Sequence, residues 1–565
     1  MIIRLLILRK LMAGPLGGTD GSCMFSWPLS FGTGSPVGRA IQTHLPARNR
    51  LLANSWAGWI AQFLSYFVFP TWIAPQNVVV NQIFGGFTGL GIIPLTFDWT
   101  VVTAFLNSPL IFPWFSIANG VFGVLIFFFF TALGIHYSGS LYSDYLPMQD
   151  THSYDNTGNR YNVSLIMNPD LTLNETAYKA YSPLFLSTNF SISYGVSFAI
   201  IAAVLVYTAL YNGREVWERA RLARNQDADV HMKMMGKYRD SPDWWYLAVY
   251  VVLFALSLAT VLNWDTHLAW WAFIICMLIP AIFLIPIGMV QAVGNFQIGL
   301  NVLTEFIIGY MQPGRPLAMM IFKTYGYITM AQALYFLQDL KLAHYMKVPP
   351  RTVFFAQCIA TFWSSIVQVS VYNWAIGAIP KICTPQQPNN YTCPSANTFY
   401  TASVIWGAIG PGRIFSPGSI YAVMQWYWLL GAMLPIFTYA IARKWPRSFV
   451  RYIHVPLMLG TTGWIPPATC YIYFCWGTVG FIFNFWIKRR WAGWWSQYNF
   501  VTSAALDTGL FVSTLVIFFA LQLRNINPPQ WWGNVDVFNT LDATDKAVRI
   551  VLPPGETFGP PPGSW

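Results

Sequence analysis

The sequence carries very little charge for its length. Only 9% of its 565 residues are Asp, Glu, Lys or Arg, whereas 55% are hydrophobic. A soluble domain carries about 25% charged residues, so a single soluble enzyme domain is excluded and the chain is expected to lie in a lipid bilayer. The net charge of +11 comes from Lys and Arg in short segments between apolar runs. That pattern is typical of cytosolic loops and does not indicate nucleic-acid binding.

Two further absences narrow the chemistry. The seven Cys and seven His show no spacing typical of a metal site, and most Cys lie within apolar runs. The sequence also shows no nucleophile paired with a general base on one face, which a membrane enzyme would need. We therefore expect no cofactor, no resident metal and no enzymatic activity. A transporter, a channel and a transport-inactive scaffold remain as alternatives.

Apolar runs of spanning length recur along most of the chain. A spanning helix needs about 20 mostly apolar residues, and the pattern predicts an all-α, multi-pass membrane protein with roughly 12–14 such helices, several broken by Gly or Pro. Three parts are expected: a segment at 1–46 that is neither a spanning helix nor a secretory signal, a transmembrane domain at 47–525, and a polar tail rich in Pro, Trp and Gly at 526–565.

Two kinds of signal predict the side of the membrane that each loop faces. The long loop at 137–189 contains three Asn-X-Ser/Thr patterns, which favour a lumenal or extracellular position. The charged stretch at 212–243, one helix further on, is rich in Lys and Arg and fits the cytosolic side. A fourth pattern lies in the loop at 380–398. The candidate glycosylation residues are Asn162, Asn174, Asn189 and Asn390.

Cys383 and Cys393 flank the short Pro- and Asn-rich stretch that holds Asn390. An oxidising outer face permits a disulfide bond between these two residues, although spacing alone does not prove the pairing.

Polar residues gather at membrane depth in the segment 291–311. An unpaired carboxylate such as that of Glu305 costs several kcal/mol there, and Lys323 in the next apolar run is the predicted partner. Gly and Pro beside such groups are typical of discontinuous helices that line a transporter's central site. The alternative is a purely structural ion pair that locks two helices. The accompanying amides are Asn295, Gln297 and Asn301.

In the stretch DLKLAHYMKVPPR, residues 339–351, membrane topology explains the basic residues and the prolines but leaves one residue unexplained. Its basic residues suit a cytosolic loop and its two prolines end one element and order the start of the next. His344 is not needed for topology, and its ordinary pKa of about 6.5 suits proton exchange. Asp339 lies five residues before it; the alternative is that both only cap or solvate an interfacial segment. The topological residues are Lys341, Lys347, Pro349, Pro350 and Arg351.

This stretch closely resembles the signature of the oligopeptide transporter family. The agreement continues in GLNVLTEFIIGYMQPGRP, WGAIGPGRIF, IPPAT, WWSQYNFVTSAALDTG and WWGN, and upstream in WIAPQNVVVNQIFGGFTGLGIIPLTFDW and SPLFLSTNFSISYG. It covers residues 51 to 535 and is closer to the peptide-transporting branch of fungi and plants than to the branch that moves metal chelates.

The resemblance implies a multi-pass plasma-membrane symporter that imports peptides of about three to six residues, or glutathione, with the proton gradient. In a central cavity, amides and tyrosines would pair with peptide backbone and an Arg would meet a carboxylate. Asp98 and Asp507 are further candidate proton sites. The substrate-binding candidates are Asn295, Gln297, Asn301, Tyr310, Arg315 and Arg413, and the proton-coupling candidates are Glu305, Lys323, Asp339 and His344.

The chain departs from the family pattern in two ways. Ala343 stands where the signature usually has Gly. The further helices and the Asn-Pro-Gly motif that family members carry near their amino end are not found, so the chain resembles an amino-truncated member. The alternative functions are therefore transport of metal chelates, such as siderophore-like or nicotianamine-like complexes, and an inactive remnant.

Overall fold

The computed structural model describes residues 67–96, 98–222, 230–383, 393–524, 535–561, 563 and 565. The predicted segment 1–46 and Asn390 lie outside the described residues. Within the described ranges the regular structure is almost wholly helical, and the one sheet pairs two short antiparallel strands, β1 (Ser153–Tyr154) and β2 (Phe185–Leu186).

Seven helices in these ranges are long and apolar enough to cross a membrane. They confirm the predicted all-α, multi-pass class, while the number of roughly 12–14 spans stays a prediction. The seven are Trp114–Tyr137, Thr188–Glu218, Asp243–Asn263, Trp270–Gly294, Pro350–Ala378, Cys470–Arg490 and Ala492–Ala520.

The remaining helices are shorter, and several begin at a proline, whose fixed φ and missing N–H suit a first helical turn. The α-helices that surround the centre are α15 (Asn301–Met311), α16 (Pro316–Lys323), α17 (Thr329–Met346), α19 (Pro394–Ala402), α20 (Pro411–Ile414), α21 (Trp426–Lys444) and α22 (Val455–Gly460). The peripheral ones are α4 (Phe69–Ile73), α5 (Val78–Phe84), α6 (Trp99–Thr103), α9 (Glu175–Tyr181) and α12 (Val230–Met235).

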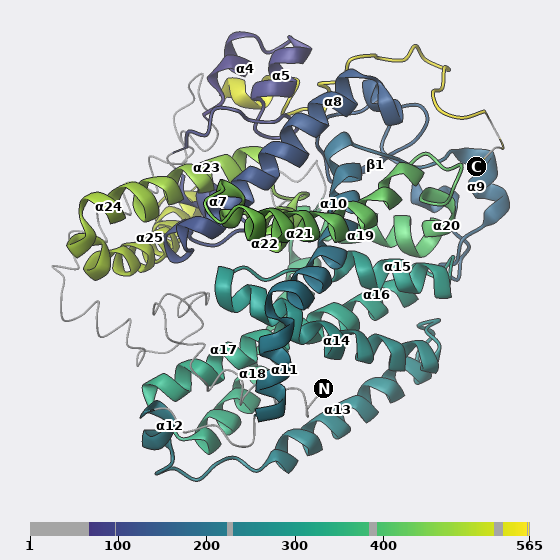
Figure 1. Ribbon diagram of the computed structural model, residues 1–565. Coiled ribbons are helices and arrows are strands. Elements are labelled where there is room, and N and C mark those ends of the chain that lie inside the picture. The colour runs from purple at the N-terminus through teal and green to yellow at the C-terminus, as the bar shows by residue number, and fades with distance from the viewer. Residues whose placement is uncertain are drawn as a thin grey trace.

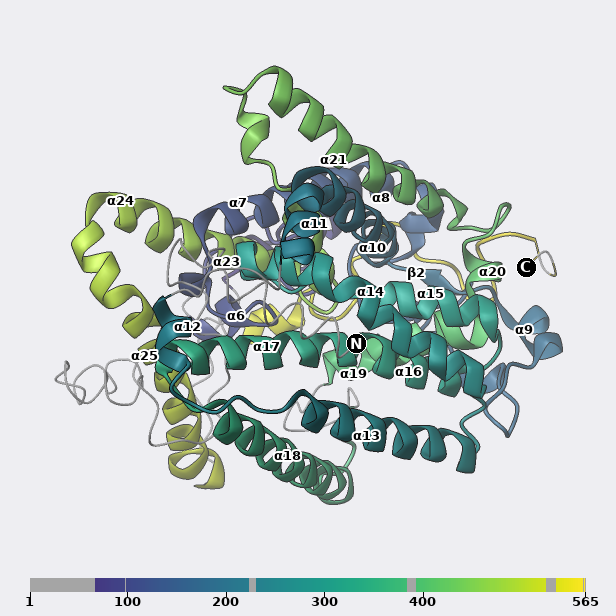
Figure 2. The same ribbon diagram turned by 60° about the horizontal axis from the view of Figure 1, so that its bottom comes forward.

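Helix α10 (Thr188–Tyr207), the first part of the span Thr188–Glu218, forms the middle of the molecule (Figure 1). Most of its residues are buried, including Phe198 and Ala199. It packs along α21 and against α15 and α22, as the two views together show (Figure 2). Because small residues allow helix backbones to approach closely in membranes, Gly431 of α21 sits directly against the carbonyl group of Ala199.

This close approach gives a first prediction, that Gly431→Ala destabilises the fold by about 1–3 kcal/mol through overpacking. A Cβ at position 431 would lie 2.0 Å from the Ala199 carbonyl oxygen. Gly377→Ala is the matched control, because a Cβ there meets nothing within 4 Å and Ala favours the helix. Thermal unfolding of the purified chain in detergent measures both variants; equal midpoints would contradict the packing argument.

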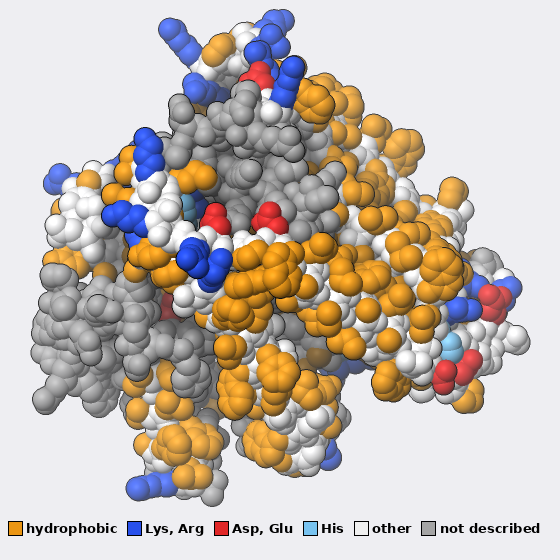
Figure 3. Space-filling view, turned by 90° about the horizontal axis from the view of Figure 1, so that it is seen from below, with side chains coloured by type: hydrophobic (Ala, Val, Ile, Leu, Met, Phe, Trp, Pro, Cys, Tyr) orange, Lys and Arg blue, Asp and Glu red, His pale blue; other side chains and the backbone are white. Residues whose placement is uncertain are grey.

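The helices α13 (Asp243–Asn263) and α18 (Pro350–Ala378) lie at the edge of the molecule (Figure 2). Large apolar side chains on them are exposed, for example Leu253, Ile359 and Trp363. On the face that includes this edge, hydrophobic side chains cover much of the surface of the described residues (Figure 3). An exposed apolar surface of this kind suits contact with lipid rather than with water.

The two ends of the span that contains α10 carry the two predicted kinds of loop. At one end, Lys347 Nζ donates to His231 Nδ1 at 2.6 Å and Arg351 Nε donates to the Asp240 carbonyl oxygen at 3.1 Å, which joins the segment 212–243 to the stretch 339–351. At the other end, residues of the 137–189 loop bind the turn after α15, where the Leu173 amide donates to the Gly314 carbonyl oxygen.

The disulfide bond between Cys383 and Cys393 is formed, with their Cα atoms 4.9 Å apart. Of the candidate glycosylation residues, Asn162 is exposed and Asn174 caps α9 at its amino end. Asn189 is a correction to the sequence prediction. Its side chain is fully buried and donates to Gln149 Oε1 at 3.1 Å, so no glycan fits on it in this fold.

Candidate functional site

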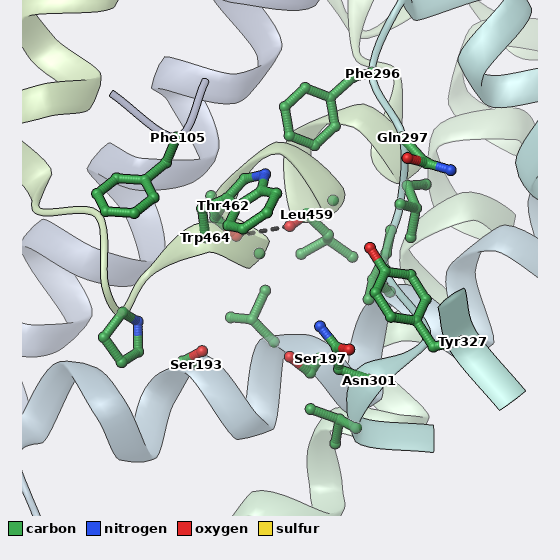
Figure 4. A pocket seen from close by; sticks show the side chains of 18 of the residues that line it. Phe105, Ser193, Ser197, Phe296, Gln297, Asn301, Tyr327, Leu459, Thr462 and Trp464 are labelled. Carbon is green, nitrogen blue, oxygen red and sulfur yellow. Dashed lines mark hydrogen bonds between the residues drawn. The ribbon is translucent and has the colours of Figure 1, made fainter. Parts of the chain in front are cut away.

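A cavity of about 170 Å³ lies in the centre of the molecule, beside α10. Ser193 and Ser197 project into it from α10, and Thr462 and Trp464 come from the turn after α22 on the opposite side (Figure 4). Gln297, Asn301 and Tyr327 form a third wall. The lining is therefore a mixture of amides, hydroxyls and aromatic rings.

The wall that holds Gln297 is a break between two helices. Helix α14 (Trp270–Gly294) ends where Asn295 adopts a left-handed conformation with φ of 54°, and α15 begins only at Asn301. The Asn295 and Gln297 amides donate to the carbonyl oxygens of Ile111 and Ala331, at 3.4 and 3.3 Å. Irregular backbone at membrane depth is tolerated where it lines a cavity, so this break agrees with the predicted discontinuous helix.

Glu305 and Lys323 form the predicted ion pair. Lys323 Nζ lies 2.5 Å from Glu305 Oε1, and the residues are 8% and 1% exposed, respectively. The ammonium group also lies 4.3 Å from the centre of the Phe399 ring, a cation–π contact. Among the described residues that line the cavity, these two alone are charged. The cavity thus holds one positive and one negative charge, and its net charge is zero.

Three predicted substrate-binding residues do not line the cavity. The Tyr310 side chain is exposed. Arg315 Nη1 donates to the His267 carbonyl oxygen at 3.2 Å, and Arg413 Nη2 pairs with Glu175 Oε1 at 2.5 Å. The structure corrects the idea that either arginine meets a substrate carboxylate in this cavity, because both guanidinium groups are engaged near the 137–189 loop.

The stretch 339–351 lies at the other end of the molecule and also outside the cavity lining. Asp339 Oδ2 accepts a hydrogen bond from Gln357 Nε2 at 3.2 Å, and the His344 ring lies 6.3 Å from that of His231. The prolines act as predicted, with Pro349 capping α18 and Pro350 as its first residue.

Asp98 and Asp507, the two further candidate proton sites, also lie outside the cavity lining. Asp98 caps α6 by accepting from the Thr100 amide at 2.9 Å, and Asp507 Oδ1 accepts from Trp99 Nε1 at 2.7 Å. Neither residue lines the cavity.

The α10 wall and the wall that follows α22 were not predicted from the sequence. Ser193 and Ser197 are four residues apart on one helix, so they share a face; two hydroxyls on a buried apolar helix were the available signal. Thr462 and Trp464 precede the IPPAT motif. Only the fold reveals that they lie across the cavity from α10.

These features define a class: a multi-pass helical membrane protein whose broken helices enclose a polar cavity with balanced charge. The chain belongs to the OPT oligopeptide transporter family, whose family model matches residues 51–521.

Named relatives agree with this assignment. The chain is 47% identical over 509 residues to Sexual differentiation process protein isp4 of Schizosaccharomyces pombe, an alignment covering 90% of this chain and 65% of that protein. It is 42% identical over 502 residues to Glutathione transporter 1 of the same yeast, covering 89% and 59%. It is 39% identical over 507 residues to Oligopeptide transporter 1 of Saccharomyces cerevisiae, covering 89% and 63%. The chain therefore spans about three fifths to two thirds of the length of these relatives.

Proposed function

We propose that this chain imports small oligopeptides and glutathione across the plasma membrane together with protons. The observation that carries the proposal is the buried Glu305–Lys323 pair, at 2.5 Å, in the wall of a cavity otherwise lined by uncharged groups. Family membership and relatives named as glutathione and oligopeptide transporters support the choice of substrate.

The uncharged lining suits the part that all peptides share, their backbone. Asn301, Ser193 and Ser197 offer both donors and acceptors for peptide groups, and the aromatic rings of Phe105 and Trp464 give apolar contact to varied side chains. Within the described part of the chain, the buried Gln291 Oε1 has no hydrogen-bond partner. Because Gln291 belongs to the cavity lining, a substrate N–H is a suitable donor to this oxygen.

The ion pair couples transport to protons and recognises the carboxylate end of the peptide. Breaking a buried pair by removing one partner leaves a charge that costs about 3–5 kcal/mol. A proton on Glu305 neutralises that carboxylate and frees Lys323 for a peptide carboxylate, so the lysine exchanges one anionic partner for another. Proton and substrate then bind together, as symport requires.

The cavity has to widen before a peptide enters. Pockets that hold drug-sized ligands measure about 300–1,000 Å³, whereas this one measures about 170 Å³. Its walls include the break between α14 and α15 and Tyr327 in the π-helical turn Thr324–Ile328 that links α16 to α17. Such non-α segments offer hinges for alternating access.

Uptake by cells tests the proposal. Peptide-transport-deficient cells that expose this chain at their surface should accumulate labelled glutathione and a labelled tetrapeptide, more at acidic than at neutral external pH. A protonophore should abolish the difference. Metal-free peptides should compete with the label, which separates peptide from metal-chelate transport. No uptake despite verified surface expression would overturn the proposal.

A further inference from the structure

The carboxyl tail is folded onto the body of the protein. One side chain, Asp542, makes several of the attaching hydrogen bonds: it is fully buried and its carboxylate lies in the Gly-rich loop that follows α5. Its Oδ2 accepts from the Gly86 and Phe87 amides at 2.9 and 3.1 Å, and its Oδ1 accepts from the amides of Thr88 and Gly89 at 2.7 and 2.9 Å. The Thr88 hydroxyl lies 3.0 Å from Oδ1 and 2.9 Å from the Asp542 carbonyl oxygen, and its one proton is shared between these two acceptors.

The loop is shaped around this carboxylate. A Cβ at Gly85 would lie 2.3 Å from Asp542 Oδ1, so only glycine permits the approach. Successive backbone amides that converge on one point form an anion-binding concavity. Asn81 completes the attachment, because its Oδ1 accepts from the Asp542 amide at 3.1 Å.

The same loop is connected to the cavity through Gln149. The Gln149 amide donates to the Thr88 carbonyl oxygen at 3.1 Å. Its side chain donates to the Ala468 carbonyl oxygen at 3.0 Å and accepts from Asn189 at 3.1 Å. Ala468 is two residues from Pro466 and Asn189 is next to Phe190, and both of these neighbours line the cavity.

Beyond Asp542, the tail binds the 137–189 loop at several points. Arg549 Nη1 pairs with Asp144 Oδ1 at 2.5 Å, and Asp545 pairs with Arg160 at 2.9 Å. The Phe558 ring stacks on Tyr145 with centroids 4.6 Å apart. The tail and the loop therefore lie together at one end of the span containing α10, and the basic segment 212–243 follows the other end of that span.

We propose that the carboxyl tail is a fixed part of the non-cytosolic face and that Asp542, as a positioning residue, holds the outer cavity wall through the Gly85–Gly89 loop and Gln149. The tail's position stands on contacts alone, whereas the effect on substrate rests on the proposed function. Because the carboxylate accepts from four backbone amides, an amide in its place directs N–H groups at N–H groups and weakens the attachment.

Cysteine labelling tests the side of the membrane. Val551 is exposed in the tail and Lys237 is exposed in the basic segment. In intact cells a membrane-impermeant maleimide should label Val551→Cys above the background of the unmodified chain, and Lys237→Cys only after permeabilisation. Labelling of Val551→Cys only after permeabilisation would overturn the proposal.

Asp542→Asn tests the positioning role, with Asp536→Asn, an exposed tail carboxylate, as the matched control. For equal surface amounts we expect Asp542→Asn to raise KM for peptide about tenfold with a nearly unchanged maximal rate, and Asp536→Asn to change neither. A lower surface amount with unchanged KM would show a merely structural role and would overturn the positioning claim.

A second readout does not depend on uptake. External trypsin should remove a carboxyl-terminal epitope faster from Asp542→Asn than from Asp536→Asn, because Lys546 and Arg549 are exposed on a loosened tail. Equal rates would overturn the attachment. If the unmodified chain takes up no peptide, the proposed function fails, and these protease rates still decide whether Asp542 fastens the tail.

Discussion

Glu305→Gln is expected to abolish acid-stimulated uptake and to destabilise the protein. The amide has nearly the shape of the carboxylate, but it carries no charge and cannot take up and release a proton as a carboxylate does. It leaves the Lys323 ammonium, 8% exposed, without its counter-ion, which costs about 3–5 kcal/mol. Uptake at a series of external pH values and thermal unfolding in detergent measure the two effects.

The double variant Glu305→Gln/Lys323→Met separates coupling from stability. Replacing both members of a buried ion pair by neutral groups is often nearly neutral for stability, so the unfolding midpoint should recover while acid-stimulated uptake stays absent. Acid-stimulated uptake at the normal level in the double variant would show that the pair only locks α15 to α16. Glu175→Gln is the matched control: it breaks the Arg413 pair, in which the Glu175 side chain is 66% exposed, and should cost at most about 1 kcal/mol.

The pairing of Glu305 with Lys323 could be predicted from sequence because it depends on the residues of two short segments and on the energy of a buried charge. Both residues lie in neighbouring apolar segments, and a lone charge at membrane depth is costly. The break before α15 was similarly visible in its Gly and Asn residues. Both features depend on short stretches of chain and on the solvent that surrounds them.

The positions of Arg315 and Arg413 could not be predicted in the same way. Hydropathy indicates that a segment is apolar but does not give its depth or the direction of one side chain. Arg413 finds Glu175, which is 238 residues away in sequence, and Thr462 reaches the cavity of α10 from a similar separation. Such contacts depend on which helices pack together, and the periodicity of a single sequence does not reveal this.

The contacts of the carboxyl tail were even harder to predict from the sequence. Residues 526–565 have no periodicity, and composition alone describes them as a polar tail. Asp542 is ordered by backbone amides more than 450 residues earlier, donors that exist only once the Gly85–Gly89 loop has its shape. No property of the tail sequence reveals those donors.

Asn484→Leu is expected to have the largest effect on stability alone. Asn484 is 4% exposed, and its Nδ2 donates to the Pro109 and Phe112 carbonyl oxygens, each at 2.8 Å. Its Oδ1 accepts from Trp495 Nε1 at 3.1 Å. The segment it binds is a 3₁₀ turn of three residues (Pro109–Ile111) followed by extended backbone. Within this segment the Pro109 carbonyl oxygen also accepts from the Phe112 amide, but at 3.4 Å, so Asn484 supplies its shorter hydrogen bond.

Leucine branches at Cγ as asparagine does, so it removes the hydrogen bonds while keeping the shape, although its two methyl groups are larger than the amide oxygen and nitrogen. Each buried polar group left without a partner costs about 1–3 kcal/mol. Here the Phe112 carbonyl and the Trp495 Nε1–H lose their bond to Asn484, and the Pro109 carbonyl keeps only the Phe112 amide at 3.4 Å. We therefore expect a loss of several kcal/mol, seen as a large fall in the unfolding midpoint and in surface expression. Thr478→Val in the same span is the control, because the Thr478 hydroxyl is exposed and bonds only to the Phe474 carbonyl of its own helix.

Asn484→Asp distinguishes the effect of lost hydrogen bonds from the effect of altered packing. The carboxylate keeps the shape and the acceptor for Trp495, but it presents oxygen to carbonyl oxygens where the amide presented N–H. It should therefore destabilise at least as much as leucine at neutral pH and less at acidic pH, where a protonated carboxyl regains one donor. A midpoint for Asn484→Asp close to that of the unmodified chain, with Asn484→Leu still low, would show that packing rather than donation to the Pro109–Phe112 carbonyls holds this broken segment in place.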